Sequence, residues 1–259
     1  MNRLRFAVVT LAVGAFASAI WAQASGRSGR EGDPVRLRAE CQNNLKQAGL
    51  VCKMYAAENR GHFPPLVEEP GRLAFQMEAI YPEYLTEPQV LICPATDESA
   101  KWEKAPADLE EVRKAFADSS CWYLGYALPT EQEALAFVRA CKEAAKEGKA
   151  LPSEVLVETK PGADPAVVRL LVEGVERFYP ANAGNPGNPA DAAETQSRIP
   201  VVVERPGHHE PNGINVLFMD GHVEFLKYPG SYPASAAFIE ALEDLDKAPA
   251  ESSKPAETR

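Results

Sequence analysis

The sequence has little glycine, no excess of charged residues and no series of long apolar runs. Only 17 of its 259 residues are glycine, and 45% are apolar against 25% charged, which excludes collagen-like and fully disordered chains. Beyond one apolar run near the N-terminus, no stretch is long enough to span a bilayer, so a multi-spanning membrane protein is also excluded. No repeat of roughly 20–50 residues is detectable. The composition is that of a globular protein, and we expect one domain with insertions.

Sequence motifs that carry catalysis are also missing. The chain contains no G-x-S-x-G, no P-loop, no G-x-G-x-x-G after a strand, no H-E-x-x-H and no C-x-x-C. The sequence therefore gives no support for nucleophilic catalysis, for nucleotide binding or for zinc binding through one of the common motifs. We therefore expect a protein that is not an enzyme and that needs no cofactor.

Basic residues are too few for a nucleic-acid partner. Lys and Arg number 27 against 37 Asp and Glu, a net charge of −10. A cleaved leader would remove Arg3 and Arg5 but no acid, leaving 25 basic residues and a net charge of −12. Such a field repels a phosphate backbone, and no local basic patch offsets it. We predict no nucleic-acid binding.

The first 24 residues have the form of a signal peptide. A short basic segment precedes the apolar run 6–21, and Ala22-Gln23-Ala24 has the small-x-small form of a cleavage site. The run of about 16 residues is shorter than the ~20 that a membrane-spanning helix needs. We expect cleavage after Ala24 and export to the periplasm or the exterior. The alternative is a retained leader that anchors the chain in the inner membrane, with Trp21 at the interface.

The rest of the chain divides by composition. Residues 25–33 are small and polar and predict a flexible linker. Residues 34–246 carry the apolar patterning of a folded domain. Residues 247–259, rich in Pro, Ser, Glu and Lys, predict a disordered tail.

The five cysteines are an odd number, so at least one stays unpaired if the exported protein forms disulfides. Cys41 and Cys52 are eleven residues apart on one expected helix, about 16 Å along its axis, so they cannot bond to each other. We expect a bridge that involves Cys93, with Cys41, Cys93 and Cys121 as the candidates. Buried free thiols remain the alternative for Cys52 and Cys141.

Apolar spacing and capping residues predict a mixed α and β chain. Asp33-Pro34 is a helix start, and apolar residues then recur at steps of three and four up to about residue 59. Thr130-Glu131-Gln132-Glu133 has the form of a capping box. The expected helices are 34–59, 73–81, 107–117, 130–147 and 165–178; the expected strands are 90–92, 121–128, 154–158 and 199–204; and the expected surface loop is 180–197.

Residues 214–226 predict a β-hairpin with Asp220-Gly221 as a two-residue turn. Asp220 and Gly221 are therefore interpreted as structural turn residues with no chemistry assigned. In this register Met219 faces His222, and the next pairs follow from it. The face expected to pack on the long helix consists of Val216, Phe218, Val223 and Phe225.

Histidines near carboxylates raise the question of a metal site. His222 and Glu224 share the other face of the hairpin, and His208 and His209 come from the preceding loop. Imidazole and carboxylate are common ligands of zinc. Because no fixed ligand spacing is present, we expect no metal, and His209, His222 and Glu224 stay as weak candidates.

Two segments carry a resemblance to a known family. Residues 41–50, continued by 54–65, and residues 215–226 with their Asp-Gly pair resemble the helix and the C-terminal element of type II secretion pseudopilin-like proteins of planctomycetes and related bacteria. In that family a histidine lies nine residues before the Asp-Gly pair; here ten residues separate His209 from Asp220. The leader is degenerate, because Val8-Val9-Thr10 replaces the end of the family's Phe-Thr-Leu-Ile-Glu.

The resemblance implies an α+β, pilin-like fold, in which a long N-terminal helix packs on an antiparallel sheet and further helices are inserted. It implies a non-enzymatic exported protein that acts through contacts with other envelope or secretion-system proteins. The alternatives from other classes are a metal- or ligand-binding envelope protein, hydrolysis included, that uses the region of His209, His222 and Glu224, and a membrane-anchored minor pseudopilin.

Overall fold

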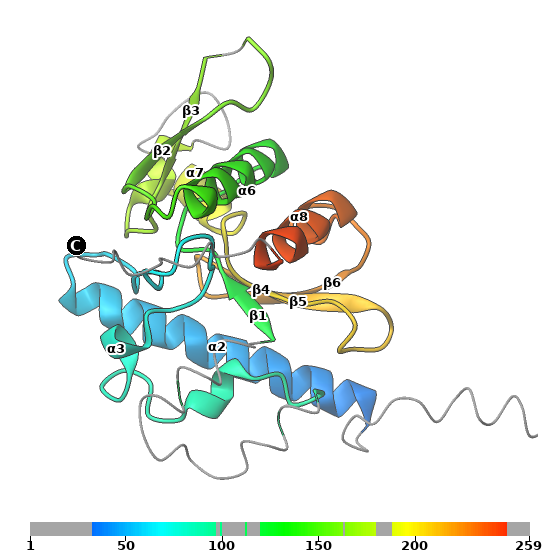
Figure 1. Ribbon diagram of the computed structural model, residues 1–259. Coiled ribbons are helices and arrows are strands. Elements are labelled where there is room, and N and C mark those ends of the chain that lie inside the picture. The colour runs from blue at the N-terminus through cyan, green and yellow to red at the C-terminus, as the bar shows by residue number, and fades with distance from the viewer. Residues whose placement is uncertain are drawn as a thin grey trace, which may run out of the picture.

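The computed structural model describes residues 33–96, 99, 112, 120–162, 164–179 and 188–247. The fold is α+β, with a four-stranded antiparallel sheet in the order β1-β4-β5-β6 and helices on both faces (Figure 1). The strands of this sheet are β1 (Cys121–Tyr123), β4 (Pro200–Glu204), β5 (Gly213–Phe218) and β6 (Val223–Lys227). A separate antiparallel pair consists of β2 (Glu154–Val157) and β3 (Ala166–Arg169). The helices are α2 (Pro34–Glu58), α3 (Met77–Ile80), α6 (Glu131–Lys146), α7 (Pro189–Gln196) and α8 (Ala236–Asp246), with the 3-10 helices η1 (Pro88–Leu91) and η2 (Val175–Phe178).

The long helix expected at 34–59 is confirmed as α2. Its start follows the sequence signal, because the Asp33 side chain accepts a hydrogen bond from the Val35 amide at 3.0 Å and Pro34 occupies the first helical position. A Cβ at Gly49 would lie 3.0 Å from Leu217 Cδ1, so this glycine lets α2 approach β5 closely. The residues that α2 buries include Leu37, Cys41, Leu45, Ala48 and Cys52.

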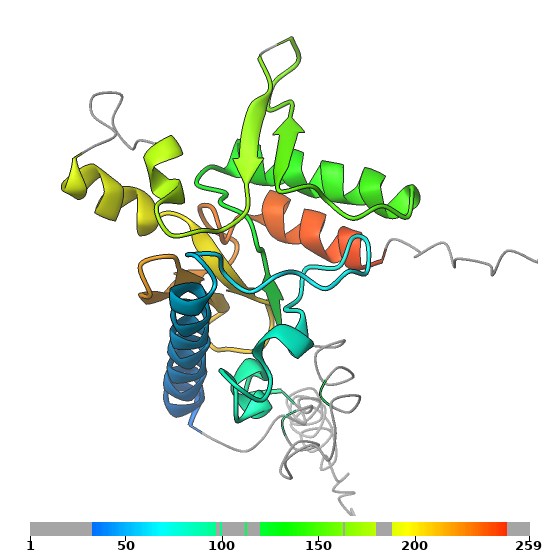
Figure 2. The ribbon, with the colours of Figure 1, turned by 90° about the vertical axis from the view of Figure 1, so that its left-hand side faces the viewer.

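Helices α6 and α8 cover the face of the sheet opposite to α2 (Figure 2). Every residue of β4 and of β5 is buried, because both faces of these strands are covered. Of the expected capping box, the N-cap is confirmed at the start of α6, where the Glu133 amide donates to Thr130 Oγ1 at 3.3 Å. The Glu133 carboxylate accepts from the Thr130 hydroxyl at 2.6 Å. The core on this side contains Trp122, Phe137, Val216 and Phe238.

The β5–β6 hairpin is present, but the expected register is wrong by one residue. Phe218 N donates to His222 O at 2.9 Å, so the loop has three residues, and Leu217 pairs with Val223. Gly221, at φ +91°, takes the left-handed position that such a loop requires. The face expected to pack on the long helix is therefore divided. Val216 and Phe218 lie toward α6 and α8, whereas Val223 and Phe225 share the α2 side with Leu217.

The helix expected at 165–178 is also wrong, because this segment forms β3 and η2. Val167 and Val168 are β-branched, which favours an extended backbone, and β3 pairs with β2. The strand expected at 154–158 is thereby confirmed as β2, whose residues alternate between exposed and buried. The strand expected at 199–204 is confirmed as β4, while that at 121–128 is reduced to β1.

Three shorter elements differ from the prediction, two of them because a proline or a capping residue starts a helix. The strand expected at 90–92 does not form, because Val90 and Leu91 belong to η1, which Pro88 opens, and Ile92 follows it. Within the loop expected at 180–197, Asn188 caps α7, with its side chain accepting from the Ala190 amide at 3.1 Å. Of the helix expected at 73–81, only α3 forms. Of the helix expected at 107–117 only Val112 is described, as a helical and buried residue; the leader, and the tail beyond Lys247, lie outside the described residues.

Among the helices of the described ranges, none combines the length and the apolar character that crossing a membrane requires.

Candidate metal centre

Four chemically reactive side chains meet where the long helix crosses the end of the sheet. Cys41 lies on the buried side of α2, and Glu204 is the last residue of β4. Cys93 follows η1 by two residues, and His209 lies in the loop before β5, where it forms a bridge with Gly213. We call Cys41, Cys93, Glu204 and His209 the four-residue cluster.

The ligand atoms of the cluster converge on one point. One ligand atom from each of the four side chains lies within 4.8 Å of all the others. The Cys41 thiol donates to Glu204 Oε1 at 2.9 Å. His209 Nε2 lies 2.9 Å from that same oxygen and 3.5 Å from Cys93 Sγ.

The cluster is closed to solvent and held by neighbouring polar groups. Cys41 and Cys93 are each 2% exposed, Glu204 is 0% exposed and His209 is 5% exposed. The other carboxylate oxygen, Glu204 Oε2, accepts hydrogen bonds from the backbone and side-chain nitrogens of Asn215, both at 2.9 Å. With one oxygen fixed in this way, the other points into the cluster.

The electrostatics separate charge inside the cluster. A hydrogen bond from Cys41 lowers the pKa of the Cys93 thiol to about 2, against the opposing effect of burial. Burial would lower the pKa of His209, but its interactions with Cys93 and Glu204 raise it to about 10. The hydrogen bond to Cys93, together with burial, raises the pKa of Cys41. The contacts within the cluster thus make the Cys93 thiol more acidic and the His209 imidazole more basic than usual.

A thiolate, an imidazole and a carboxylate in contact suggest a catalytic triad, but the geometry opposes one. In a triad, one ring nitrogen of the histidine faces the nucleophile and the other faces the carboxylate. Here Nε2 faces both Cys93 and Glu204. Burial also keeps substrate from the sulfur. The same residue types are ligands of zinc and related ions, and this is the chemistry that the arrangement suits.

The structure separates the three weak metal candidates. His209 belongs to the cluster, whereas His222 Nδ1 bonds to Asp220 Oδ1 at 2.6 Å in the hairpin turn and its ring stacks on Phe218. Glu224 is an exposed residue of β6, opposite Val216. The three side chains do not form one site.

The five cysteines, which all lie in the described part of the chain, form no disulfide in this structure. Of the three bridge candidates, Cys41 and Cys93 lie in the four-residue cluster. Cys121 lies beside it, in β1, paired with Glu204 across the sheet. Burial raises the pKa of Cys52 and that of Cys141 to about 12, so both are protonated at neutral pH.

Sequence reasoning missed Glu204 as a site residue and treated Cys41 and Cys93 only as a possible bridge. A signal for Glu204 exists, because it ends the apolar run Val201-Val202-Val203 and precedes His209 by five residues. A carboxylate that closes a buried strand needs a partner. Asp220 and Gly221 lie in the hairpin turn, and the cleavage residues Ala22 and Ala24 lie outside the described part of the chain.

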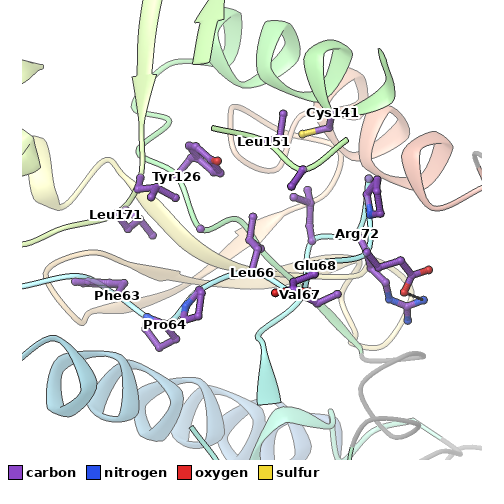
Figure 3. Close-up of a pocket in the computed structure, with 18 of the residues that line it drawn as sticks. Phe63, Pro64, Leu66, Val67, Glu68, Arg72, Tyr126, Cys141, Leu151 and Leu171 are labelled. Atoms are coloured by element: carbon purple, nitrogen blue, oxygen red, sulfur yellow. Dashed lines mark ion pairs between the residues drawn. The ribbon is translucent and has the colours of Figure 1, made fainter. Parts of the chain in front are cut away.

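A second feature is an open pocket of about 380 Å³ between the segment 62–73 and the α6 side of the molecule. Figure 3 shows Leu66, Tyr126, Leu151 and Leu171 around it. The lining is mainly apolar, and nothing in it converges as the cluster does.

The chain matches no family model, no curated protein and no solved structure.

Proposed function

We propose that this chain is an exported, non-enzymatic, pseudopilin-like domain that acts through protein contacts in a type II secretion or other envelope assembly. The observation that carries the proposal is the packing of one 25-residue helix, α2, along an antiparallel sheet. That arrangement is what the resemblance of residues 41–65 and 215–226 implies. The degenerate leader favours a domain that docks without polymerising.

The position of the reactive side chains supports a role without catalysis. The four-residue cluster combines thiol, carboxylate and imidazole groups, yet each of its residues is at most 5% exposed. Enzymes place such groups where substrate can reach them. Buried groups of this kind serve the architecture of a domain.

The exposed side of α2 offers a surface for contacts. Leu50 is 60% exposed and Met54, one turn later, is 43% exposed. Residues four apart lie on the same face of a helix. An apolar pair on the exposed side of a helix is suited to bury against a partner.

Site-specific cross-linking in cells tests this function. A photoreactive amino acid at Leu50, in the full-length chain, should give a discrete adduct that mass spectrometry identifies as containing a subunit of the envelope assembly. The matched control is the same amino acid at Glu143, on α6, whose side chain is 67% exposed. Identical adducts from both positions, or none from Leu50 in cells where the assembly is present, would contradict the proposal.

The N-terminus of the native protein distinguishes the forms of this function. A chain that begins at Ser25 in a soluble envelope fraction supports an exported domain. A membrane-bound chain that begins near Phe6 indicates an anchored minor pseudopilin. Recovery of an uncleaved chain in the cytoplasm would exclude both.

A further inference from the structure

We propose that the four-residue cluster binds one zinc ion as a closed structural site. The ion would fasten α2, the turn after η1 and the β4–β5 corner to one another. This inference does not depend on the proposed function, because it concerns how the domain is held together.

The donor set selects the class of ion. Two sulfurs, one nitrogen and one carboxylate oxygen suit zinc, which binds Cys, His and Asp or Glu in four-coordinate sites. Calcium and magnesium require oxygen ligands and would not use Cys41 and Cys93. The site therefore excludes the hard divalent ions.

The contacts among the four residues exceed what their protons can satisfy. His209 Nε2 carries a single hydrogen but faces both Glu204 Oε1 and Cys93 Sγ. The Cys41 thiol also converges on Glu204 Oε1. One cation at the centre would satisfy all four ligand atoms at once. On binding, the protons of the Cys41 thiol and of His209 Nε2 pass to solvent.

The spacing fits a tetrahedral ion with a small adjustment. A sulfur and a nitrogen that bind one zinc ion tetrahedrally lie about 3.6 Å apart, and Cys93 Sγ and His209 Nε2 lie 3.5 Å apart. The distances from Glu204 Oε1 to Cys41 Sγ and to His209 Nε2, both 2.9 Å, are those of hydrogen bonds. They would lengthen by roughly 0.5–0.7 Å as the oxygen turns onto the ion.

The surroundings supply an outer shell and two unexplained polar atoms. Asn215 holds the second oxygen of Glu204, as outer-shell groups hold metal-binding carboxylates. Within the described residues, three buried side-chain atoms have no hydrogen-bond partner, and two of them are His208 Nδ1 and Asn215 Oδ1. Both residues touch the cluster, Asn215 at Glu204 and His208 at Cys93. Two buried polar atoms without partners therefore belong to residues that touch the cluster.

Closure makes the site structural. Catalytic zinc keeps a position open for water, whereas structural zinc has four protein ligands. Here the four ligands come from distant segments, with Cys41 and Glu204 alone 163 residues apart in sequence, and they lie beneath the surface.

Metal analysis of the full chain, purified without chelator, tests the site. We expect about one zinc per chain by mass spectrometry of the metal, and loss of that zinc in Cys41→Ser and in Cys93→Ser. Cys52→Ser is the matched control, since Cys52 is also buried in α2, three turns further on. Cys141→Ser, in α6, is the second control. Both controls should keep one zinc.

If the ligand variants fail to fold, two further measurements test the zinc site. Wild-type protein stripped of zinc and loaded with Co²⁺ should show thiolate-to-cobalt charge-transfer absorption and a tetrahedral cobalt spectrum. Glu204→Gln, which keeps the length of the side chain and removes its charge, should bind zinc at least tenfold more weakly.

Three outcomes would overturn the proposal. The wild-type chain could contain no zinc and bind no Co²⁺ after reduction. The intact mass of the native protein could show a Cys41–Cys93 disulfide in place of the metal. Cys93→Ser and Cys52→Ser could retain equal zinc. None of these results bears on the cross-link at Leu50, so the two proposals fail separately.

Discussion

At the scale of single residues, buried hydrogen bonds between a side chain and the backbone contribute to the stability of the core. Tyr123, which is 2% exposed, donates from its hydroxyl to the carbonyl oxygen of Pro64 at 2.6 Å. That bond holds the segment after α2 against β1. A buried acceptor that loses its donor is left without a partner, since water cannot replace it.

Tyr123→Phe should therefore lower the free energy of unfolding by about 1–3 kcal/mol, measured by urea denaturation. Tyr84→Phe is the control, because its hydroxyl bonds to Glu58 at an equal 2.6 Å but in an exposed position. The control should lose much less stability, because water can replace the partner of an exposed hydroxyl. Equal losses would show that burial of the bond is not what matters.

Asn215 is the residue through which the position of Glu204 can be tested. Asn215→Ala removes the side-chain bond to Glu204 Oε2 and leaves the backbone bond in place. We expect zinc affinity to fall about 10–100-fold, as for other outer-shell groups, by competition with a chelator. Asn212→Ala, on the exposed loop that precedes β5, should leave the affinity unchanged. A fall in stability with unaltered zinc affinity would contradict the positioning role.

At the scale of elements, α8 is fastened at its C-terminal end. Asp246 Oδ2 accepts from the Trp122 indole at 2.9 Å and from Arg205 Nη1 at 2.6 Å. The Arg205 guanidinium in turn lies 4.2 Å from the centroid of the Trp122 ring. These contacts join α8 to β1 and to the residue after β4.

Asp246→Ala should lower the free energy of unfolding by about 1–3 kcal/mol, because the buried Trp122 indole loses its acceptor. Asp244→Ala is a control on the same helix, since Asp244 is 62% exposed and its nearest lysine nitrogen is 3.6 Å away. That change should cost at most about 0.5 kcal/mol in thermal or urea denaturation. A larger loss in the control would place the anchor of α8 elsewhere.

The elements also show what could be predicted from the sequence. α2 and α6 were predictable because a cap and a long apolar period agree in each. The hairpin register was not, since Met219-Asp220-Gly221 suits a three-residue loop as well as Asp220-Gly221 suits a two-residue loop. Asp164-Pro165, directly before β3, has the form of a helix start, whereas β3 itself contains two β-branched valines. Pairing with β2 decides in favour of the strand.

The cluster could be predicted only in parts. His209 was a candidate ligand and Cys41 and Cys93 were candidates for a bridge, so three of the four side chains had been singled out. Their meeting depends on contacts between residues as far apart as Cys41 and Glu204, which are 163 positions from each other. Local patterns carry no information on such a distance, and only the packing of α2 on the sheet brings the ligands together.

At the scale of the whole molecule, the zinc site predicts a stability that depends on metal. With free zinc 100-fold above its Kd, the native state gains about 2.7 kcal/mol. For a domain of this size that corresponds to a rise of roughly 5–10 °C in Tm. Adding a chelator should remove this gain in differential scanning fluorimetry, and Cys41→Ser should show the same Tm with zinc and with chelator. Hydrogen exchange should locate the loss of protection in α2 and the β4–β5 corner.

The order of the elements along the chain has a consequence for synthesis. α2 leaves the ribosome early, but the strands that cover its apolar side, β4 and β5, begin at residues 200 and 213. At about 5–20 residues per second, roughly 10–30 seconds pass between the two. During that time the apolar side of α2 has no native partner, so the nascent chain depends on chaperones that bind exposed apolar segments. A chain that stops before β4 cannot complete its hydrophobic core.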